Sequence, residues 1–359
     1  MTARISTMVN LLPGTSSTAM VDTESSPPEQ QDSIMISSGH NDYILATALD
    51  AYGGRLATCS GDRCVKVWVL HQNEWTLAHT WQAHTSAVTD VAWAHPEFGT
   101  LLATASADHS WKVWQDEGSS IKSTSYTMKA TLTEARRAAT CVAFAPRHWG
   151  LKVASGSADG CLRIYEAVDV ANVAQWPLAA TLTMTQQQNH DNGGHQQQHQ
   201  QHTATHTTAN HHSISAVSWC TGRFDAPTLA TASTVGCTVV RYSEQARNWQ
   251  AILQIPSAVI DVAWAPNVGR RHHTLAMTTA AGGLRIVTLE RATTQLASTQ
   301  DMDDGGSSAV WKCQWNVTGT VLATTGDAGL LQLYKKDPST GDYKVVSQVR
   351  GDLEKIAGT

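Results

Sequence analysis

The sequence predicts an all-β protein that folds as a six-bladed β-propeller, and three observations support this prediction. A short phrase of the kind "SADHSWKVW" occurs six times, and its successive ends lie 46, 51, 77, 45 and 47 residues apart. Each unit contains short strand-like runs separated by turn residues. A period near 40–45 residues with strand content is typical of propeller blades. The six phrases end at Trp68, Trp114, Tyr165, Tyr242, Val287 and Tyr334.

The second unit illustrates how the strands follow one another. Residues 87–94 begin with alternating apolar and polar side chains, which predicts the innermost strand. Residues 100–106 follow a Pro- and Gly-containing turn and predict a buried strand of small residues, suited to close approach of blades. Residues 111–114 predict the third strand after a tight turn. Outer strands are predicted at residues 74–81 of the first unit and 343–349 of the last.

We expect the propeller to span residues 37–350, with blades ending near residues 81, 132, 182, 255, 298 and 350. Residues 1–36 predict a disordered N-terminal tail, and residues 351–359 a C-terminal tail. The long interval contains the Gln- and His-rich segment 186–212, which is too poor in apolar residues to fold and predicts a disordered loop. A metal site in this segment is the weaker alternative, because its irregular histidine spacing aligns no ligands.

Composition excludes several classes of function. The formal net charge is −5 with no long basic block, so we expect no direct binding of nucleic acid through bulk electrostatics. The seven cysteines stand singly and form no CxxC pair, which indicates reduced core cysteines in a cytosolic or nuclear protein. No apolar run is long enough to predict a transmembrane segment, and no signal peptide is recognised. We expect no cofactor and no metal.

A polar set recurs in the first two units, and part of it recurs in the third. It resembles the network of WD40-type blades, in which a turn Asp joins a His, a Ser or Thr and the strand-ending Trp. A catalytic Ser-His-Asp interpretation is rejected because the set repeats at a structural spacing. The set comprises His40, Ser60, Asp62 and Trp68, then His84, Ser106, Asp108 and Trp114, then Asp159.

The later units lack this turn aspartate. Units four and five carry Gly236 and Ala281 in its place, and unit six carries Ala328 with Asp327 shifted by one residue. We therefore expect blades four to six to be held by packing alone.

Three stretches resemble one family closely. Residues 144–176, 262–277 and 315–329 are similar to the Y-complex nucleoporin that is homologous to the small propeller of the COPII outer coat. The resemblance extends from about Gly39 to Tyr334. The departures are the N-terminal tail, the Gln/His-rich insertion and the tyrosine at Tyr334.

The resemblance implies a structural scaffold subunit of the nuclear-pore outer ring, at the nuclear envelope, that supports transport of mRNA and protein. It implies an open propeller whose missing blade an α-solenoid nucleoporin donates in trans, together with contacts to other Y-complex nucleoporins. It also implies a role in a SEA/GATOR-type nutrient-sensing assembly of the TORC pathway, at a lysosomal or vacuolar surface.

The unit count agrees with an open ring, because no segment is left over to close it. Residues 33–37 ("SIMIS") predict a lead-in strand of blade one. Exposed strand edges at blades one and six would invite a partner that adds strands. We expect partner contacts at Ile44, Leu45, Trp311 and Trp315, and ordinary core positions are the alternative, favoured for the two tryptophans.

Other functions fit less well. A generic WD40 adaptor, such as a COPII coat subunit or a ubiquitin-ligase substrate receptor, is the main alternative, but no W-D-x-R motif follows Trp68 or Trp114. A G-protein β-subunit would carry an N-terminal heptad helix. An enzyme would need convergent groups near the axis, and Asp90 and Asp261 at matched positions lack a complementary histidine or nucleophile. We therefore predict a non-enzymatic scaffold.

Overall fold

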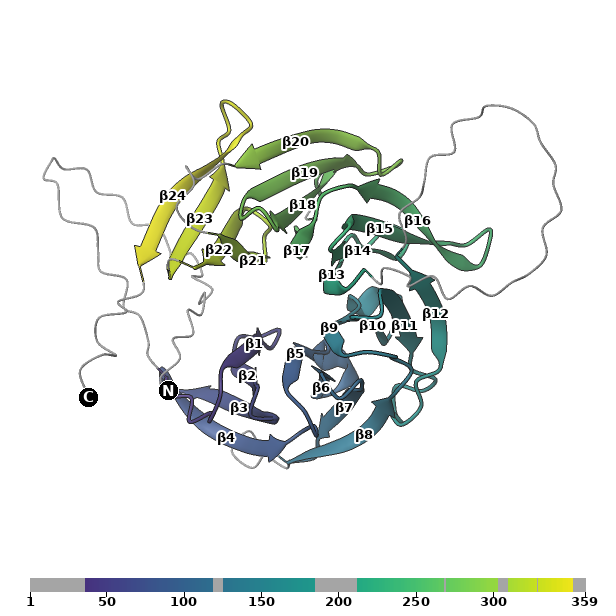
Figure 1. The fold of residues 1–359 in the computed structure, drawn as a ribbon, viewed down its shortest axis with the longest axis vertical. Coiled ribbons are helices and arrows are strands. Elements are labelled where there is room, and N and C mark those ends of the chain that lie inside the picture. Colours follow the sequence, from purple (N-terminus) through teal and green to yellow (C-terminus); the bar gives the residue numbers. More distant parts are fainter. Residues whose placement is uncertain are drawn as a thin grey trace, which may run out of the picture.

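The computed structural model describes residues 36–118, 125–184, 212–267, 269–302, 309–327 and 329–350. These residues form six four-stranded antiparallel sheets and two short 3-10 helices. The sheets stand as blades around one central axis (Figure 1). The predicted six-bladed propeller is confirmed.

Each blade uses four consecutive strands. Blade 1 contains β1 (Ile44–Leu49), β2 (Arg55–Ser60), β3 (Cys64–His71) and β4 (Glu74–Gln82). Blade 2 contains β5 (Val88–Trp93), η1 (Pro96–Phe98), β6 (Leu101–Ser106), β7 (Trp111–Asp116) and β8 (Tyr126–Leu132). Blade 3 contains β9 (Ala139–Phe144), η2 (Arg147–Trp149), β10 (Lys152–Ser157), β11 (Cys161–Glu166) and β12 (Leu178–Thr183).

The other three blades repeat this order. Blade 4 contains β13 (Ile214–Trp219), β14 (Thr228–Ser233), β15 (Gly236–Ser243) and β16 (Asn248–Ile255). Blade 5 contains β17 (Val259–Trp264), β18 (His272–Thr279), β19 (Leu284–Glu290) and β20 (Leu296–Met302). Blade 6 contains β21 (Val310–Trp315), β22 (Val321–Gly326), β23 (Leu330–Lys336) and β24 (Tyr343–Arg350). Within the described ranges, every sheet is complete without a strand from another blade.

Blades pack face to face through apolar side chains. Five separate core clusters lie across the five junctions from blade 1 to blade 6. In the junction of blades 3 and 4, Leu162 and Ile164 of β11 are both fully buried. Close approach needs small residues on the second strand: a Cβ on Gly156 would lie 2.6 Å from the Ile214 side chain. The small-residue strands predicted from the sequence therefore lie where blades approach most closely.

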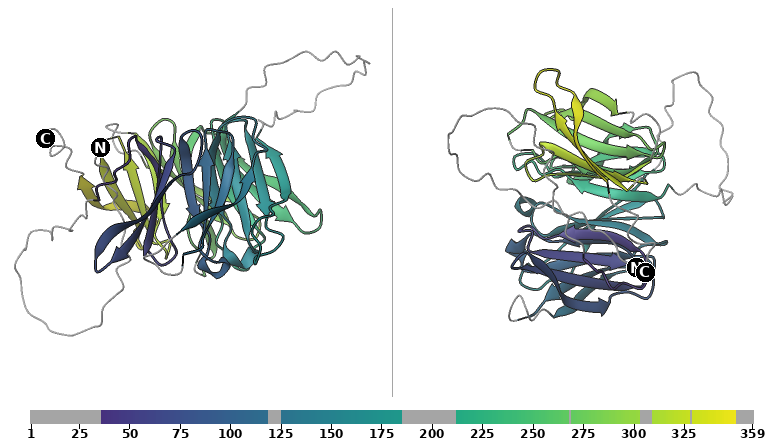
Figure 2. Two further views of the ribbon diagram at one scale, coloured as in Figure 1. Left: turned by 90° about the horizontal axis from the view of Figure 1, so that it is seen from below. Right: turned by 90° about the vertical axis from the view of Figure 1, so that its left-hand side faces the viewer.

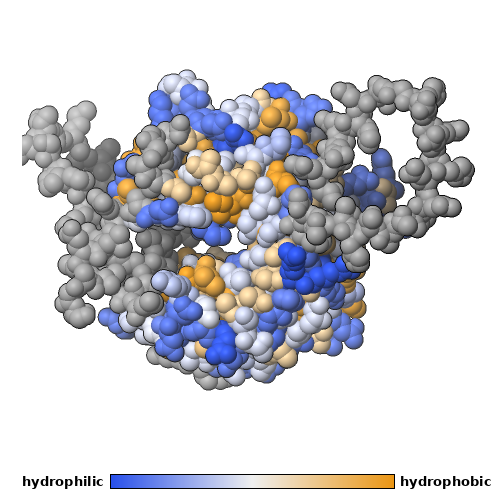
Figure 3. Space-filling view, in the orientation of Figure 1, coloured by the Kyte–Doolittle hydropathy of each residue, from blue (hydrophilic) through white to orange (hydrophobic). Residues whose placement is uncertain are grey.

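The junction between blades 6 and 1 is different. Among the described residues, no core cluster joins these two blades, and Figure 2 shows their sheets apart in its right-hand view. Leu331 and Leu333 of β23 are only partly buried, although the equivalent residues of β11 are inaccessible. Figure 3 shows apolar residues over β1 and over the region of β21 and β22, on the two sides of the central hollow. Within the described chain the propeller thus has two flanks that no neighbouring blade covers, which we call the free flanks.

The first flank has a small cover of its own. Ile36 packs with Leu56 and Trp68 on the outer face of blade 1, and Lys66 donates to the Ser38 carbonyl at 2.9 Å. Of the predicted lead-in strand, only Ile36 and Ser37 are described, and neither lies in a strand. The predicted tails up to residue 35 and beyond 350, and insertion residues 186–211, lie outside the described residues.

All seven cysteines are free thiols in this structure, five of them buried. No helix in the described ranges has the length and apolar character needed to cross a membrane.

The difference between the packed and free flanks can be measured. Leu162→Ala removes a fully buried side chain and should lower the free energy of unfolding by about 2–5 kcal/mol. Leu331→Ala at the equivalent position of blade 6 should cost only about 1 kcal/mol, because less apolar area is lost. Urea unfolding followed by tryptophan fluorescence compares the two variants of the isolated chain. Equal losses would mean that the flank of blade 6 is covered as well as the other junctions.

Candidate functional site

The first two blades each contain a His-Thr-Asp-Trp network. In blade 1, His40 Nδ1 lies 2.9 Å from Asp62 Oδ2 and Nε2 lies 3.0 Å from Thr58 Oγ1, which also accepts from Trp68 Nε1 at 3.3 Å. Blade 2 repeats this with His84–Asp108 at 3.0 Å, His84–Thr104 at 2.7 Å and Trp114–Thr104 at 3.0 Å. The network ties the strand-ending tryptophan to the turn aspartate.

The hydroxyl between histidine and tryptophan belongs to a threonine that the sequence analysis did not single out. Thr58 and Thr104 hold this place, while Ser60 accepts from the Asp62 N–H at 3.2 Å and donates to a backbone carbonyl at the turn. Ser106 bonds in the same way, accepting from Asp108 N–H at 3.1 Å. A hydroxyl recurs at the threonine position in three more units, at Ser155, Thr231 and Thr324, and aligning the units on it would have found it.

The charges of this network suit structure rather than catalysis. Burial lowers the pKa of His84 to about 4, despite the opposing charge of Asp108, so the imidazole is neutral at pH 7. Burial alone would raise the pKa of Asp108, but hydrogen bonds from Ser110 and from the Thr85 N–H hold it well below its usual value. The Ser106 hydroxyl donates to backbone carbonyls. The Ser110 hydroxyl lies 3.3 Å from His84 Nδ1 but donates to Asp108 Oδ1 at 2.6 Å, and the two ring nitrogens of His84 contact Asp108 and Thr104, so neither serine is arranged as a nucleophile.

Blade 3 has Ala135 at the histidine position, and an arginine of β11 pairs with its turn aspartate instead. Arg163 Nη2 lies 2.8 Å from Asp159 Oδ2, and its Nη1 donates to Ser157 Oγ at 2.9 Å. Both charged side chains are about 95% buried, and the guanidinium lies 6.0 Å from the ring centre of Trp111 in blade 2. Such a pair is tolerated in the interior because the two charges and their hydrogen bonds satisfy each other.

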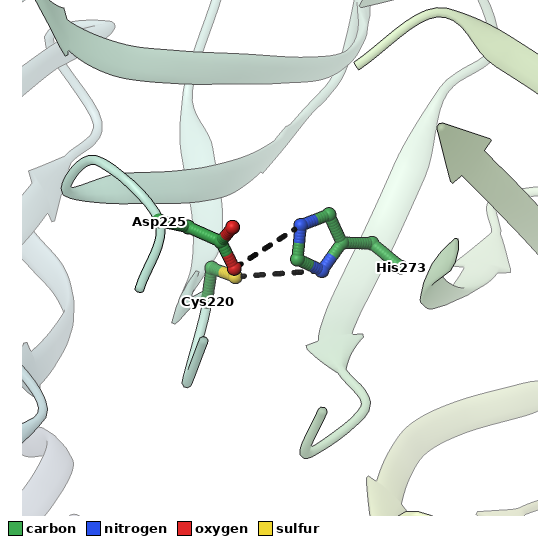
Figure 4. A group of neighbouring side chains, drawn as sticks. All are labelled: Cys220, Asp225 and His273. Carbon is green, nitrogen blue, oxygen red and sulfur yellow. Dashed lines mark hydrogen bonds and ion pairs between the residues drawn. The ribbon is translucent and has the colours of Figure 1, made fainter. Parts of the chain in front are cut away.

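Blades 4 and 5 are joined by a polar cluster, Cys220–Asp225–His273, which we call the clasp (Figure 4). Asp225, in the loop after β13, places Oδ2 3.5 Å from His273 Nε2 on β18 and Oδ1 2.7 Å from Arg291 Nε after β19. Cys220 Sγ lies 3.7 Å from His273 Nδ1. Blade 4 also closes up at Gly236, where a Cβ would lie 2.4 Å from the Ile255 carbonyl oxygen.

The clasp also offers three potential metal ligands, whose donor atoms all lie within 4.8 Å of one another. Its own bonds work against a metal: Arg291 neutralises the carboxylate, and Asn267 Nδ2 lies 3.2 Å from His273 Nδ1. Burial raises the pKa of the Cys220 thiol to about 12, whereas a ligand or a nucleophile must be a thiolate. We interpret the clasp as a structural link between blades.

Two further carboxylates lie near the axis. Asp90 Oδ2 accepts from the Val142 N–H of blade 3 at 2.9 Å, and Asp261 Oδ2 accepts from the Cys313 N–H of blade 6 at 3.0 Å. Lys312 Nζ lies 3.4 Å from Asp261 Oδ1. Burial raises the pKa of Asp90 to about 6. Each carboxylate therefore caps the inner strand of the next blade, in line with the local structural role predicted for this pair.

These contacts correct one expectation. Blades 4 to 6 are not held by packing alone, because Asp225 links blade 4 to blade 5 and Asp261 links blade 5 to blade 6. Neither residue stands in the turn where the sequence repeat places its aspartate. Comparing units identifies Asp261 as the match of Asp90 but does not identify Asp225, which has no counterpart in the other units.

A bulge on each innermost strand leaves one residue unpaired at the same place. In blades 2, 3 and 4 this residue is Thr89, Thr140 or Ser215, whose hydroxyl donates to the next blade's inner strand at 2.8, 2.6 and 3.1 Å. In blades 1 and 6 it is Leu45 and Trp311, which are 45% and 46% exposed. Blade 5 has the partly buried Ile260 at this place, so the polar relay is confined to blades 2 to 4, and blades 1, 5 and 6 carry apolar side chains there.

The four residues predicted to contact a partner differ in their exposure. Leu45 and Trp311 are exposed, and the Trp311 indole donates to Asp327 of its own blade. Ile44 is partly buried. Trp315 is 8% exposed in the junction of blades 5 and 6 and donates to the Ala263 carbonyl at 3.1 Å, so it takes the core alternative.

Six blades, the His-Thr-Asp-Trp networks and a described chain without an assembled nucleophile define a WD-repeat β-propeller of the structural class. The family model "WD domain, G-beta repeat" matches residues 31–69 and 75–115. The chain is 33% identical over 345 residues to nucleoporin SEH1 of Xenopus tropicalis, with 88% of each chain covered, and 33% and 32% identical over 352 residues to nucleoporin SEH1 of Bos taurus and Homo sapiens, with 90% covered. The chain belongs to the SEH1 nucleoporin family. Fold and relatives together indicate a structural, non-enzymatic protein.

The neutral His84 makes stability depend on pH. Its folded pKa lies below that of the unfolded chain, so the unfolded state binds the proton first and stability falls as pH drops from about 6.5 toward 4. Between pH 6.5 and 5 the free energy of unfolding of the parent should fall by about 2 kcal/mol more than that of His84→Gln, which lacks the titrating imidazole. Urea titrations of both proteins at several pH values measure it. Parallel pH curves would contradict a buried neutral histidine.

The Asp225 carboxylate of the clasp and the Arg291 guanidinium should contribute to stability as a coupled pair. Asp225→Asn, Arg291→Gln and the double variant form a thermodynamic cycle in which we expect a coupling of about 1–2 kcal/mol, because the carboxylate is buried. The surface pair Arg285–Asp301 is the matched control and should give under about 1 kcal/mol. Urea unfolding gives both values. A coupling at Asp225 no larger than in the control would remove the clasp from the set of blade links.

Proposed function

We propose that this chain is a scaffold subunit of the nuclear-pore outer ring, the Y-complex, and that its open propeller is completed by a blade from an α-solenoid nucleoporin. The observation that carries the proposal is the free pair of flanks in a member of the SEH1 nucleoporin family. A scaffold of this kind supports transport of mRNA and protein without chemistry of its own.

Three features of the flanks support completion in trans. The forward face of blade 6 presents Leu331 and Leu333, which are apolar side chains of the kind buried at the other junctions. Leu45 and Trp311 flank the central hollow and are half exposed. Exposed apolar faces of this kind mark association sites in soluble proteins.

A donated blade explains these features better than a surface contact would. A folded-in sheet would cover both flanks and bury more than a standard interface of about 1,600 Å². Its strands would stand beside β1 and β21, as neighbouring blades do elsewhere in the ring. We therefore expect a near-obligate complex, with further contacts to other Y-complex nucleoporins at the nuclear envelope. The role in a SEA/GATOR-type assembly at the lysosomal or vacuolar surface stays a prediction of the family resemblance.

Affinity purification of the tagged chain from its native cell, with mass spectrometry, tests the proposal. An α-solenoid nucleoporin should be recovered in near-equal amount. The double variant Leu45→Arg, Trp311→Arg should reduce this recovery at least tenfold, about 1.4 kcal/mol or more, because it places two charges against the donated blade.

Tyr52→Arg serves as the control, since Tyr52 is 79% exposed in the β1–β2 turn, away from the two flanks, and should leave recovery unchanged. Recovery of COPII coat subunits or cullin adaptors in place of nucleoporins would overturn the assignment. Undiminished recovery with the double variant would overturn the proposed contact surface.

A further inference from the structure

An open groove of about 1,200 Å³ lies between blades 3 and 4, on the outside of the ring and apart from the free flanks. One wall is β12, the outermost strand of blade 3. The other is formed by the loop after β13 and by the turn between β15 and β16 in blade 4. Neither the blade networks nor the proposed partner blade uses this groove.

The edge of β12 faces the groove. Four consecutive residues, Ala179–Leu182, line it, although successive side chains of a strand point to opposite faces. β12 pairs with β11 only, so its outer backbone N–H and C=O groups have no strand partner in the described structure. Three of the four residues are Ala or Thr, which leave the backbone accessible. Such an edge can accept one more strand.

The opposite wall carries cations and aromatic rings. Arg223 and Arg247 are exposed, and neither has an ion-pair partner in the described part of the chain. The carboxylates of Glu166 and Asp225 are already paired, with Lys152 and Arg291. Glu244 is the third carboxylate of the lining; it is exposed and has no ion pair in the described chain. The unpaired charges of the groove are therefore two guanidinium groups and one carboxylate, a positive excess in a chain of net charge −5.

The aromatic part of this wall is held firmly. The Trp249 ring packs edge-on against the rings of Tyr242 and Trp219, with distances between ring centroids of 5.5 and 5.8 Å. Phe224 is 88% exposed at the tip of its loop. The clasp fixes that loop at its base through Asp225. A Cβ on Gly222 would lie 1.9 Å from Asp225 Oδ2, so a larger residue there would displace the carboxylate.

We propose that the groove is a binding site for an extended acidic peptide segment of a partner protein. The segment adds a strand to β12, its carboxylates pair with Arg223 and Arg247, and an apolar side chain packs on Phe224 or Trp249. Arginine forks bind carboxylates in a bidentate way, and a fixed loop loses little entropy on binding. A free strand edge favours a peptide over a nucleic acid or a membrane, because neither of those supplies backbone groups for strand pairing.

Selection of random dodecapeptides displayed on phage against the full-length chain tests this site without assuming a sequence. We expect enrichment of peptides in which Asp or Glu alternates with apolar residues. A fluorescent copy of an enriched peptide should bind Arg223→Glu, Arg247→Glu at least tenfold more weakly than the parent, and Phe224→Ala several-fold more weakly. Arg271→Glu, an exposed arginine outside the groove lining, is the matched control and should leave affinity unchanged.

Strand addition has its own readout. Two versions of the same peptide are N-methylated on alternate backbone amides, one at the odd-numbered and one at the even-numbered residues. The version whose methyl groups face β12 should lose affinity, and the other should keep it. Equal affinity of the two methylated peptides would overturn strand addition. The site would be overturned if no acidic peptides were enriched, or if the charge-reversed variants bound them as well as the parent does. It would also be overturned if oligouridylate or phosphatidylserine vesicles bound through Arg223 and Arg247 in place of the peptide.

Discussion

Face-to-face packing between blades is the constraint on which the structure depends. Each sheet is apolar on both faces, so each needs a neighbour on both sides to bury it. Six consecutive sheets provide five such junctions, and each has its own core cluster. The sixth pair of faces has no cluster in the described chain, and Ile36 covers only a small part of one of them. The free flanks follow directly from this geometry.

Different polar groups stabilise the individual blades and some of their junctions, although the apolar packing between blades is alike. Blades 1 and 2 use the His-Thr-Asp-Trp network, blade 3 uses a buried Arg163–Asp159 pair, and blades 4 and 5 use the clasp. Near the axis, Asp90 and Asp261 cap backbone N–H groups of the following blade. In the networks of blades 1 to 3 the polar groups satisfy one another in the interior, which is the condition for burying them at small cost. In the clasp, Asp225 Oδ2 has only the 3.5 Å contact with His273 and no hydrogen bond.

The repeated features of the sequence predicted most of the fold, and most of the features that were not predicted occur only once. The recurring phrase was sufficient for the number of blades, and the turn aspartates located Asp62, Asp108 and Asp159. Thr58 and Thr104 were not predicted because Ser60 and Ser106, two residues later, also carry hydroxyl groups at a repeated position. Arg163 and the clasp could not be found by comparing units, since each appears once. Asp225 and Arg291 are far apart in the chain and meet only because two blades pack.

The free flanks and the outer groove would bind a partner through different kinds of interaction. At the flanks the surface is apolar and matches what another blade would bury, so a partner there gains mainly from the hydrophobic effect and should dissociate rarely. The groove has an unpaired strand edge and two free arginines, so a partner there gains from backbone pairing and charge, which salt weakens. The clasp belongs to the groove region: it fixes the loop that carries Phe224 while it joins blades 4 and 5. A member of this family could therefore be built permanently into a scaffold through one surface and exchange partners through the other.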